Sequence, residues 1–217
     1  MSLFILDFDE TITSENTHNA VSHLTKTEEM WDVIKEIEPI NGAEIWRTTL
    51  SSILDTGHSL AIASFNAYGS VFIPQYLREV IGLNEEEVQG IHVESWLPLK
   101  PGEANKNEHI AGAIKDMKYI GSPDTIVLVD DDLKNITAAG KNGYKTIHAA
   151  GKYIEHIHHL RDDWNYSAPS EHGFRHHLLH AFGLFQKPDL PGTDMPRRDS
   201  EPDSDNDSGP DSNCIIM

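Results

Sequence analysis

The sequence predicts an α/β protein in which a Rossmann-like parallel sheet is flanked by helices. Five short apolar runs are rich in Ile, Val and Leu and lack strict alternation, which is typical of strands buried on both faces. Patterns with a helical period lie between these runs, as expected of the crossover connections in βαβ units. We place the strands at residues 3–7, 60–64, 91–94, 125–130 and 145–148.

Helices are predicted in the segments between the strands. Thr25-Lys26-Thr27-Glu28 fits a capping box, and the helix that follows it ends before Pro39 and Gly42. Glycines follow three of the later helices and are typical of helix C-termini. Apolar spacing places these later helices at residues 45–54, 76–81, 110–117 and 133–139.

The chain changes character after the last predicted strand. Helical patterns continue over about residues 152–185, but Pro, Gly, Ser, Asp and Asn dominate from 188 to 213. Such a segment buries too little apolar surface to offset its ordering entropy, so we predict a disordered acidic tail. We therefore expect one domain over 1–187, with its core at about 1–150, then the tail over 188–213 and a short motif at 214–217.

Composition narrows the classes of function. The chain has 217 residues and a formal net charge of −18, and this acidity predicts no nucleic acid partner, because phosphate backbones are repelled. Cys214 is the single cysteine, so an intrachain disulfide is excluded, which is typical of a reducing compartment. No apolar run is long enough for a membrane span and the N-terminus lacks a signal peptide, so a cytoplasmic domain is expected.

Two predicted strands end in clusters of acids. Asp7 and Asp9 follow the first strand, whereas Asp130 and Asp131 follow the fourth, with Asn135 about one helical turn later. Ligands of open parallel sheets bind at the carboxyl ends of strands, and Mg2+ prefers carboxylates together with water and phosphate. Each acid could instead cap the helix after it, but two clusters on two strands favour a shared cation site.

These residues also form part of four motifs that occur in a fixed order over residues 1–150. The motifs are Asp7-Phe8-Asp9-Glu10-Thr11, the strand end Ala61-Ile62-Ala63-Ser64, Lys106 at the start of a helix, and Asp130-Asp131 with Asn135. A lone Asp-x-Asp is a weak signal, but four motifs in order are specific. With these motifs the sequence resembles the haloacid dehalogenase-like (HAD) hydrolases of the type with a minimal cap.

The resemblance implies a phosphatase that works through a phospho-aspartate. Asp7 would attack phosphorus, and Asp9 would protonate the leaving oxygen and later activate water. Thr11 would orient Asp9. An Asp at the second acid of the first motif favours a phosphatase over a dehalogenase or a phosphonate-cleaving enzyme.

The resemblance also implies a magnesium site and a phosphate site. Asp7, the backbone carbonyl of Asp9, and Asp131 would bind Mg2+, with Asp130 or Asn135 in support. Ser64 and Lys106 would bind the phosphoryl group. Two alternatives stay open: Ser64 could simply end its strand, and Lys100 or Lys115 could take the place of Lys106.

The predicted site has little to cover it. About thirty residues separate Thr11 from the helix near Ile45, which is enough for one or two short helices and not for a full cap domain. An open site permits a bulky substrate such as a phosphoprotein or a lipid headgroup, as well as a small molecule.

The chain ends in Cys214-Ile215-Ile216-Met217, which matches a prenylation signal of the type that is usually farnesylated. We therefore expect a prenyltransferase as a partner and attachment to the cytosolic face of membranes. The tail has no polybasic second signal, so attachment through one lipid would be reversible. The same signal would suit a eukaryotic protein or a bacterial protein delivered into a host cell.

Histidines gather near the end of the predicted domain. His176 and His180 have a spacing that can bind zinc on a helix, but histidines on a helix surface are the simpler interpretation. For the whole protein, the alternative hypothesis is a noncatalytic scaffold that keeps the fold and is targeted by its prenylated tail. A phosphotransferase would need a shielded site, which the short cap does not predict.

Overall fold

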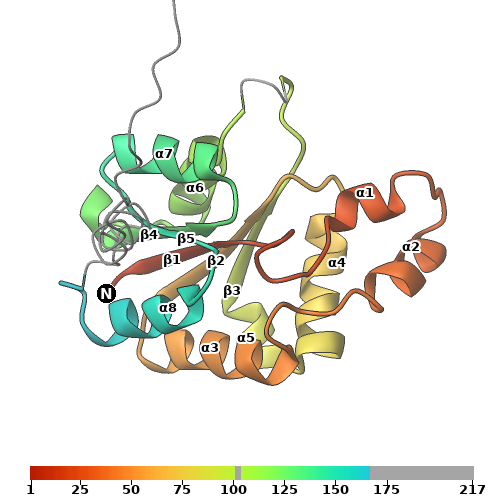
Figure 1. Ribbon diagram of the computed structural model, residues 1–217, viewed down its shortest axis with the longest axis horizontal. Coiled ribbons are helices and arrows are strands. Elements are labelled where there is room, and N and C mark those ends of the chain that lie inside the picture. Colours follow the sequence, from red (N-terminus) through yellow and green to blue (C-terminus); the bar gives the residue numbers. More distant parts are fainter. Residues whose placement is uncertain (101–103, 167–217) are drawn as a thin grey trace, which may run out of the picture. The chain divides into compact units, whose positions relative to one another are not determined.

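The computed structural model describes residues 1–100 and 104–166. Its five strands form one parallel sheet in the order β3-β2-β1-β4-β5, which confirms the predicted fold class (Figure 1). The predicted tail, the prenylation motif with Cys214, and the helical pattern beyond residue 166 lie outside the described residues. The strands are β1 (Leu3–Asp7), β2 (Ser59–Ser64), β3 (Ile91–Ser95), β4 (Ile126–Asp130) and β5 (Lys145–His148).

The centre of the sheet is buried on both faces. Every residue of β1 and β4 is buried, and their register pairs Leu3 with Ile126 through Leu6 with Val129. This burial explains the continuous apolar runs in the sequence, because neither face of these strands meets water. The edge strands β3 and β5 are only partly buried.

Helices cover the two faces of the sheet unequally (Figure 1). Phe4 and Leu6 of β1 pack into a large apolar cluster with α3, α4 and α8, whereas Leu3 and Ile5 pack into a smaller one with α6 and α7. The helices are α1 (Thr17–Val21), α2 (Thr27–Ile34), α3 (Ala43–Asp55), α4 (Gly69–Tyr76), α5 (Glu85–Gln89), α6 (Asn107–Asp116), α7 (Leu133–Lys141) and α8 (Tyr153–Asp162), with a π-helical turn at Leu77–Ile81 and a 3-10 turn at Pro123–Thr125.

The order of the strands places a switch point between β1 and β4. The chain first builds β1, β2 and β3 toward one edge and then returns to add β4 and β5 on the other side of β1. Connections leave in opposite directions at such a point, which opens a crevice at the carboxyl ends of the strands. Asp7 ends β1 and Asp130 ends β4, so both acids lie at this crevice.

Two predictions about helix ends were wrong in detail. The capping box at Thr25–Glu28 does not form: Lys26 is the N-cap of α2 and makes no side-chain capping bond, so Thr25 lies one residue too early. The structure has a capping box at Asn84 and Glu87 instead, at the start of α5. The pattern at residues 76–81 is the end of α4 followed by the π-helical turn, and the helix begins earlier, at Gly69.

Helix α4 approaches β3 so closely that a side chain would not fit at Gly69. A Cβ built there would lie 2.1 Å from Ser95 Oγ, which itself donates to the backbone oxygen of Asn66. We expect Gly69→Ala to reduce the free energy of unfolding by about 1–3 kcal/mol, as overpacking does, measured by urea denaturation.

The matched control is Gly140→Ala in α7, where a Cβ would meet nothing within 4 Å. This change should be neutral or stabilising, because alanine favours the helix. Adding Ser95→Gly to Gly69→Ala should recover part of the loss. Equal stability of the two alanine variants would contradict the close packing of α4 on β3.

Candidate active site

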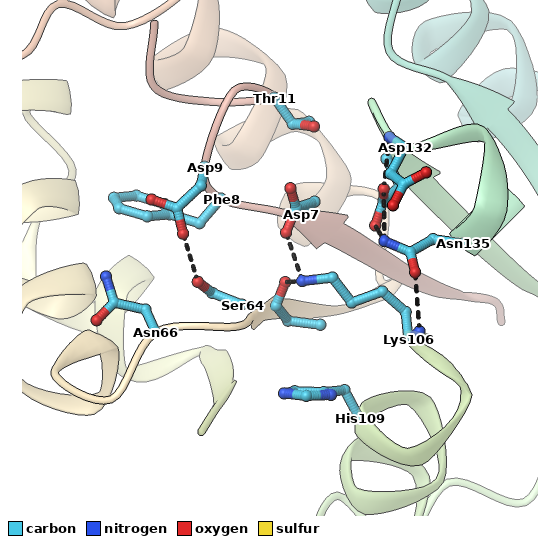
Figure 2. Close-up of polar contacts among 12 residues, drawn as sticks. Asp7, Phe8, Asp9, Thr11, Ser64, Asn66, Lys106, His109, Asp132 and Asn135 are labelled. Atoms are coloured by element: carbon cyan, nitrogen blue, oxygen red, sulfur yellow. Dashed lines mark hydrogen bonds and ion pairs between the residues drawn. The ribbon is translucent and has the colours of Figure 1, made fainter. Parts of the chain in front are cut away.

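A cavity of about 510 Å³ lies at the carboxyl ends of β1 and β4. Figure 2 shows the polar contacts among residues of this region. Asp7, Asp9, Lys106, Asp131 and Asn135 are among the residues that line it. These five residues come from three segments that are far apart in the sequence, and the parallel sheet brings the segments together. Five of the predicted residues therefore converge on one cavity, whereas Thr11, Ser64 and Asp130 are not among its lining residues.

A buried ion pair forms the floor of the cavity. Lys106 is only 2% exposed, and its Nζ donates to Asp7 Oδ1 at 2.6 Å and to the backbone oxygen of Ala63 at 2.7 Å. The ammonium group also lies 4.3 Å from the centre of the Phe65 ring. The backbone N–H of Lys106 donates to Asn135 Oδ1 at 3.2 Å, which holds the start of α6 against α7. Among Lys100, Lys106 and Lys115, it is Lys106 that lies at Asp7.

Asp130 is held by hydrogen bonds from the start of the next helix. Asn135 Nδ2 donates to both of its carboxylate oxygens at 2.9 and 3.1 Å, and the backbone N–H of Asp132 donates to Oδ1 at 2.9 Å. Burial raises the pKa of Asp130 to about 6, against the opposing charge of Lys106. Asp132 caps α7 through a bond from the backbone N–H of Lys134.

Three carboxylates lie close enough to hold one cation. One oxygen from each of Asp7, Asp130 and Asp131 can be chosen so that all lie within 4.8 Å of one another. Burial also raises the pKa of Asp7, although the Lys106 ammonium acts in the opposite direction. Three hard oxygen donors around a partly open cavity fit Mg2+, which binds a few carboxylates and keeps water and phosphate as its other ligands.

Asp131 is supported from two sides. Thr11 Oγ1 lies 3.5 Å from Asp131 Oδ1, at the limit of a hydrogen bond, and His148 Nε2 donates to the backbone oxygen of Asp131 at 2.9 Å. The backbone oxygen of Thr11 accepts from Tyr153 of α8 at 2.8 Å. The structure thus places Thr11 beside Asp131 and not, as the sequence analysis expected, in contact with Asp9.

Asp9 is bound by other groups. Its Oδ1 accepts from the backbone N–H and the hydroxyl of Thr17 at 2.6 and 2.5 Å, and its Oδ2 accepts from Ser64 Oγ at 2.7 Å. Ser64 therefore contacts Asp9 directly, and its expected contact with a phosphoryl oxygen stays a prediction. The Asp9 side chain is not in the group of three carboxylates, and the expected role of its backbone carbonyl in binding Mg2+ stays a prediction as well.

Four residues of this region were missed by the sequence analysis as members of the site. His148 ends β5 and lines the cavity, so the rule that located Asp7 and Asp130 could have found it. Phe65 follows Ser64 directly. Thr17 and His109 carry no such signal, because neither ends a strand. Their place in the site depends on how their segments fold in three dimensions.

His109 packs against two aromatic rings. Its ring stacks on Trp96 with centres 3.9 Å apart and is nearly perpendicular to the Phe65 ring, with centres 4.8 Å apart. Its Nε2 donates to the backbone oxygen of Trp96 at 3.2 Å. Burial, together with the charge of Lys106, lowers the pKa of His109 from 6.5 to about 4. The ring is therefore neutral at pH 7 and leaves Lys106 as the cation beside Asp7.

Comparisons with known proteins found similarity only to solved structures. No family model matches the chain, and no curated protein matches it. A phosphoserine phosphatase, described as a phospho-aspartyl intermediate analogue, is 17% identical with a TM-score of 0.47, over 72% of this chain and 90% of that one. CbbY from Rhodobacter sphaeroides, in complex with phosphate, is 15% identical with a TM-score of 0.44, over 72% and 89% of the two chains. The HAD domain of effector protein Lem4 from Legionella pneumophila is 16% identical with a TM-score of 0.46, over 76% and 95%.

Within residues 1–100 and 104–166, no helix has the length and apolar character that a bilayer span requires.

The buried ion pair makes a testable contribution to stability. Lys106→Met leaves the Asp7 carboxylate buried without its cation, and we expect the free energy of unfolding to fall by about 3 kcal/mol at pH 7. The loss should be smaller at pH 5 than at pH 7, because burial raises the pKa of Asp7 and protonation removes the uncompensated charge. Urea denaturation at the two pH values measures both effects.

The control is Arg47→Met, which removes the exposed ion pair of Arg47 with Glu44 and should change stability little. The double variant Lys106→Met/Asp7→Asn should recover much of the loss. If the double variant is as unstable as the sum of the single ones, the pair is not coupled as the structure shows.

His109 should make stability depend on pH with a defined sign. Because its pKa is lower in the folded chain, the unfolded chain binds more protons between pH 6.5 and 4, and this contribution to stability is lost as pH falls through that window. Relative to His109→Phe, the wild type should therefore lose roughly 3 kcal/mol between pH 7 and pH 4. Urea denaturation of both proteins across this range gives the difference, and a constant difference would show that His109 titrates normally.

Proposed function

We propose that this protein is a magnesium-dependent phosphatase that hydrolyses phosphate monoesters through a phospho-aspartate at Asp7. The observation that carries the proposal is the buried pair of Asp7 and Lys106 beside Asp130 and Asp131 at the switch point of the sheet. A nucleophilic carboxylate, a fixed cation and a further group of carboxylates are what phosphoryl transfer needs in one cavity.

The first half of the reaction would form the acyl phosphate. An oxygen of Asp7 attacks phosphorus while the bond to the leaving oxygen breaks, and Lys106 Nζ, 2.6 Å from Asp7 Oδ1, keeps the carboxylate oriented. Asp9 gives its proton to the leaving oxygen, so the product is a neutral alcohol. Phe65 and Lys106 line the same cavity.

The second half would return Asp7 to its starting state. Asp9, now deprotonated, takes a proton from a water molecule, and that water attacks phosphorus and releases inorganic phosphate. Bound Mg2+ would neutralise charge on the phosphoryl oxygens, and Asp7, Asp130 and Asp131 are the residues that would hold it. The hydrogen bonds from Asn135 and from the backbone N–H of Asp132 keep the Asp130 carboxylate in place.

The class of substrate is part of the proposal. The connection between Thr11 and α3 contains the two short helices α1 and α2, of 5 and 8 residues. This short cover supports access by a bulky phosphate ester such as a phosphoprotein, and a lipid headgroup or a small molecule would also reach the cavity. Attachment to membranes through a prenyl group on Cys214 stays a prediction from the sequence.

The decisive experiment compares the wild type with Asp7→Asn. We expect the wild type to release phosphate from p-nitrophenyl phosphate with Mg2+ and to lose that activity in EDTA. Asp7→Asn should lower the rate by at least ~1000-fold, because the nucleophile is gone. Phosphate release followed by a colorimetric assay measures both effects.

A binding experiment distinguishes the proposed phosphatase from the alternative, a noncatalytic scaffold. Beryllofluoride, a mimic of the phosphoryl group on aspartate, should protect the wild type against thermal unfolding in the presence of Mg2+ and should leave Asp7→Asn unchanged. A scaffold without catalytic function would show neither hydrolysis nor this protection. Equal hydrolysis by the two proteins would mean that Asp7 is not the nucleophile.

A further inference from the structure

The hydrogen bonds of Asp9 point to residues that the sequence motifs do not contain. We propose that Thr17 and Asn66 are positioning residues for Asp9: a chain from Asn66 through Thr17 holds the carboxyl group that delivers the proton to the leaving oxygen. The inference rests on the proposed phosphatase function. It replaces Thr11, which the sequence analysis expected in this role.

The chain is buried and short. Thr17 is 0% exposed and Asn66 is 1% exposed. The hydroxyl of Thr17 lies 2.5 Å from Asp9 Oδ1, and Asn66 Nδ2 lies 2.8 Å from the same hydroxyl. With the bond from Ser64 to Oδ2, both carboxylate oxygens of Asp9 are bound by protein groups, as the contact between Asp9 and Ser64 in Figure 2 illustrates.

The direction of each hydrogen bond follows from its neighbours. The backbone N–H of Tyr68 donates to Asn66 Oδ1 at 2.8 Å, which fixes the amide so that Nδ2 faces Thr17. An amide nitrogen only donates, so the Thr17 hydroxyl accepts from Asn66. Its single proton is then directed to Asp9. The backbone of Asn66 is fixed as well, because Ser95 Oγ donates to its carbonyl oxygen at 2.6 Å.

The position of Thr11 leaves this role to Thr17. Thr11 Oγ1 lies 3.5 Å from Asp131, on the side of the cavity that faces β4. Thr17 instead opens α1, and its backbone N–H also donates to Asp9 at 2.6 Å. Asp9 is therefore bound to the start of α1 through Thr17 and to the end of β2 through Ser64, and Thr17 is bound in turn to Asn66 in the turn after β2.

A positioned acid matters most when the leaving group is basic. Proton transfer requires the acid within about 2.6–3.2 Å of the oxygen, so a displaced Asp9 slows departure of an alkoxide or a phenoxide. p-Nitrophenolate leaves readily without a proton and should be nearly insensitive. The ratio of the two effects therefore reports on the acid and not on general damage to the site.

The experiment measures kcat/KM, with Mg2+, for phenyl phosphate and p-nitrophenyl phosphate. This parameter covers the steps up to departure of the leaving group. Thr17→Val should lower it by ~10- to 100-fold for phenyl phosphate but by less than ~3-fold for p-nitrophenyl phosphate. Thr17→Ser keeps the hydroxyl and should stay within ~3-fold of the wild type with both substrates. Asn66→Ala should show the same selective loss as Thr17→Val.

Two results would overturn the inference in an active enzyme: an equal loss with both substrates, which a merely structural role would give, or no loss in Thr17→Val. An inactive wild type would instead overturn the proposed function and the catalytic role with it.

The urea midpoints of Thr17→Val, Asp9→Asn and the double variant test the contact between Thr17 and Asp9 without any measurement of activity. Shifts that are clearly non-additive would support the contact, and additive shifts would overturn it.

Discussion

The site depends on the ion pair between Lys106 and Asp7. Desolvating either charge alone costs several kcal/mol, so each group is tolerated at the floor of the cavity because the other is there. Lys106 is also bound to the carbonyl oxygen of Ala63, and its own backbone N–H is bound to Asn135. The pair therefore joins β1, β2, α6 and α7 at one point.

The position of this ion pair depends in turn on the order of the strands in the sheet. Asp7 is central because β1 is flanked by β2 on one side and β4 on the other. Only this arrangement brings the end of β4, with Asp130 and Asp131, next to the end of β1. The apolar residues that form the sheet therefore determine where the carboxylates at the strand ends come together.

The sequence predicted those parts of the site that follow directly from strand ends. Asp7, Asp130 and Asp131 could be grouped because parallel strands end at the same edge of a sheet, and Lys106 could be chosen because it precedes a helical pattern. Thr17 and Asn66 could not, because their contact with Asp9 depends on how two loops fold over the strand ends. Thr11 was expected to orient Asp9, but after the turn at Glu10, which has a φ of 60°, its hydroxyl lies 3.5 Å from Asp131 Oδ1.

The hydrogen bonds that hold the start of α1 indicate where the short cover formed by α1 and α2 could be enlarged. Thr17 binds the start of α1 to Asp9, but the segment between α1 and α2 is largely exposed, including Ser22, His23, Thr25 and Lys26. Extra residues inserted at this segment would extend the cover from an anchored helix and leave the contacts of Asp9 in place. A larger cover could therefore be grafted here, by evolution or by a protein engineer, to narrow the choice of substrate without rebuilding the chemistry beneath it.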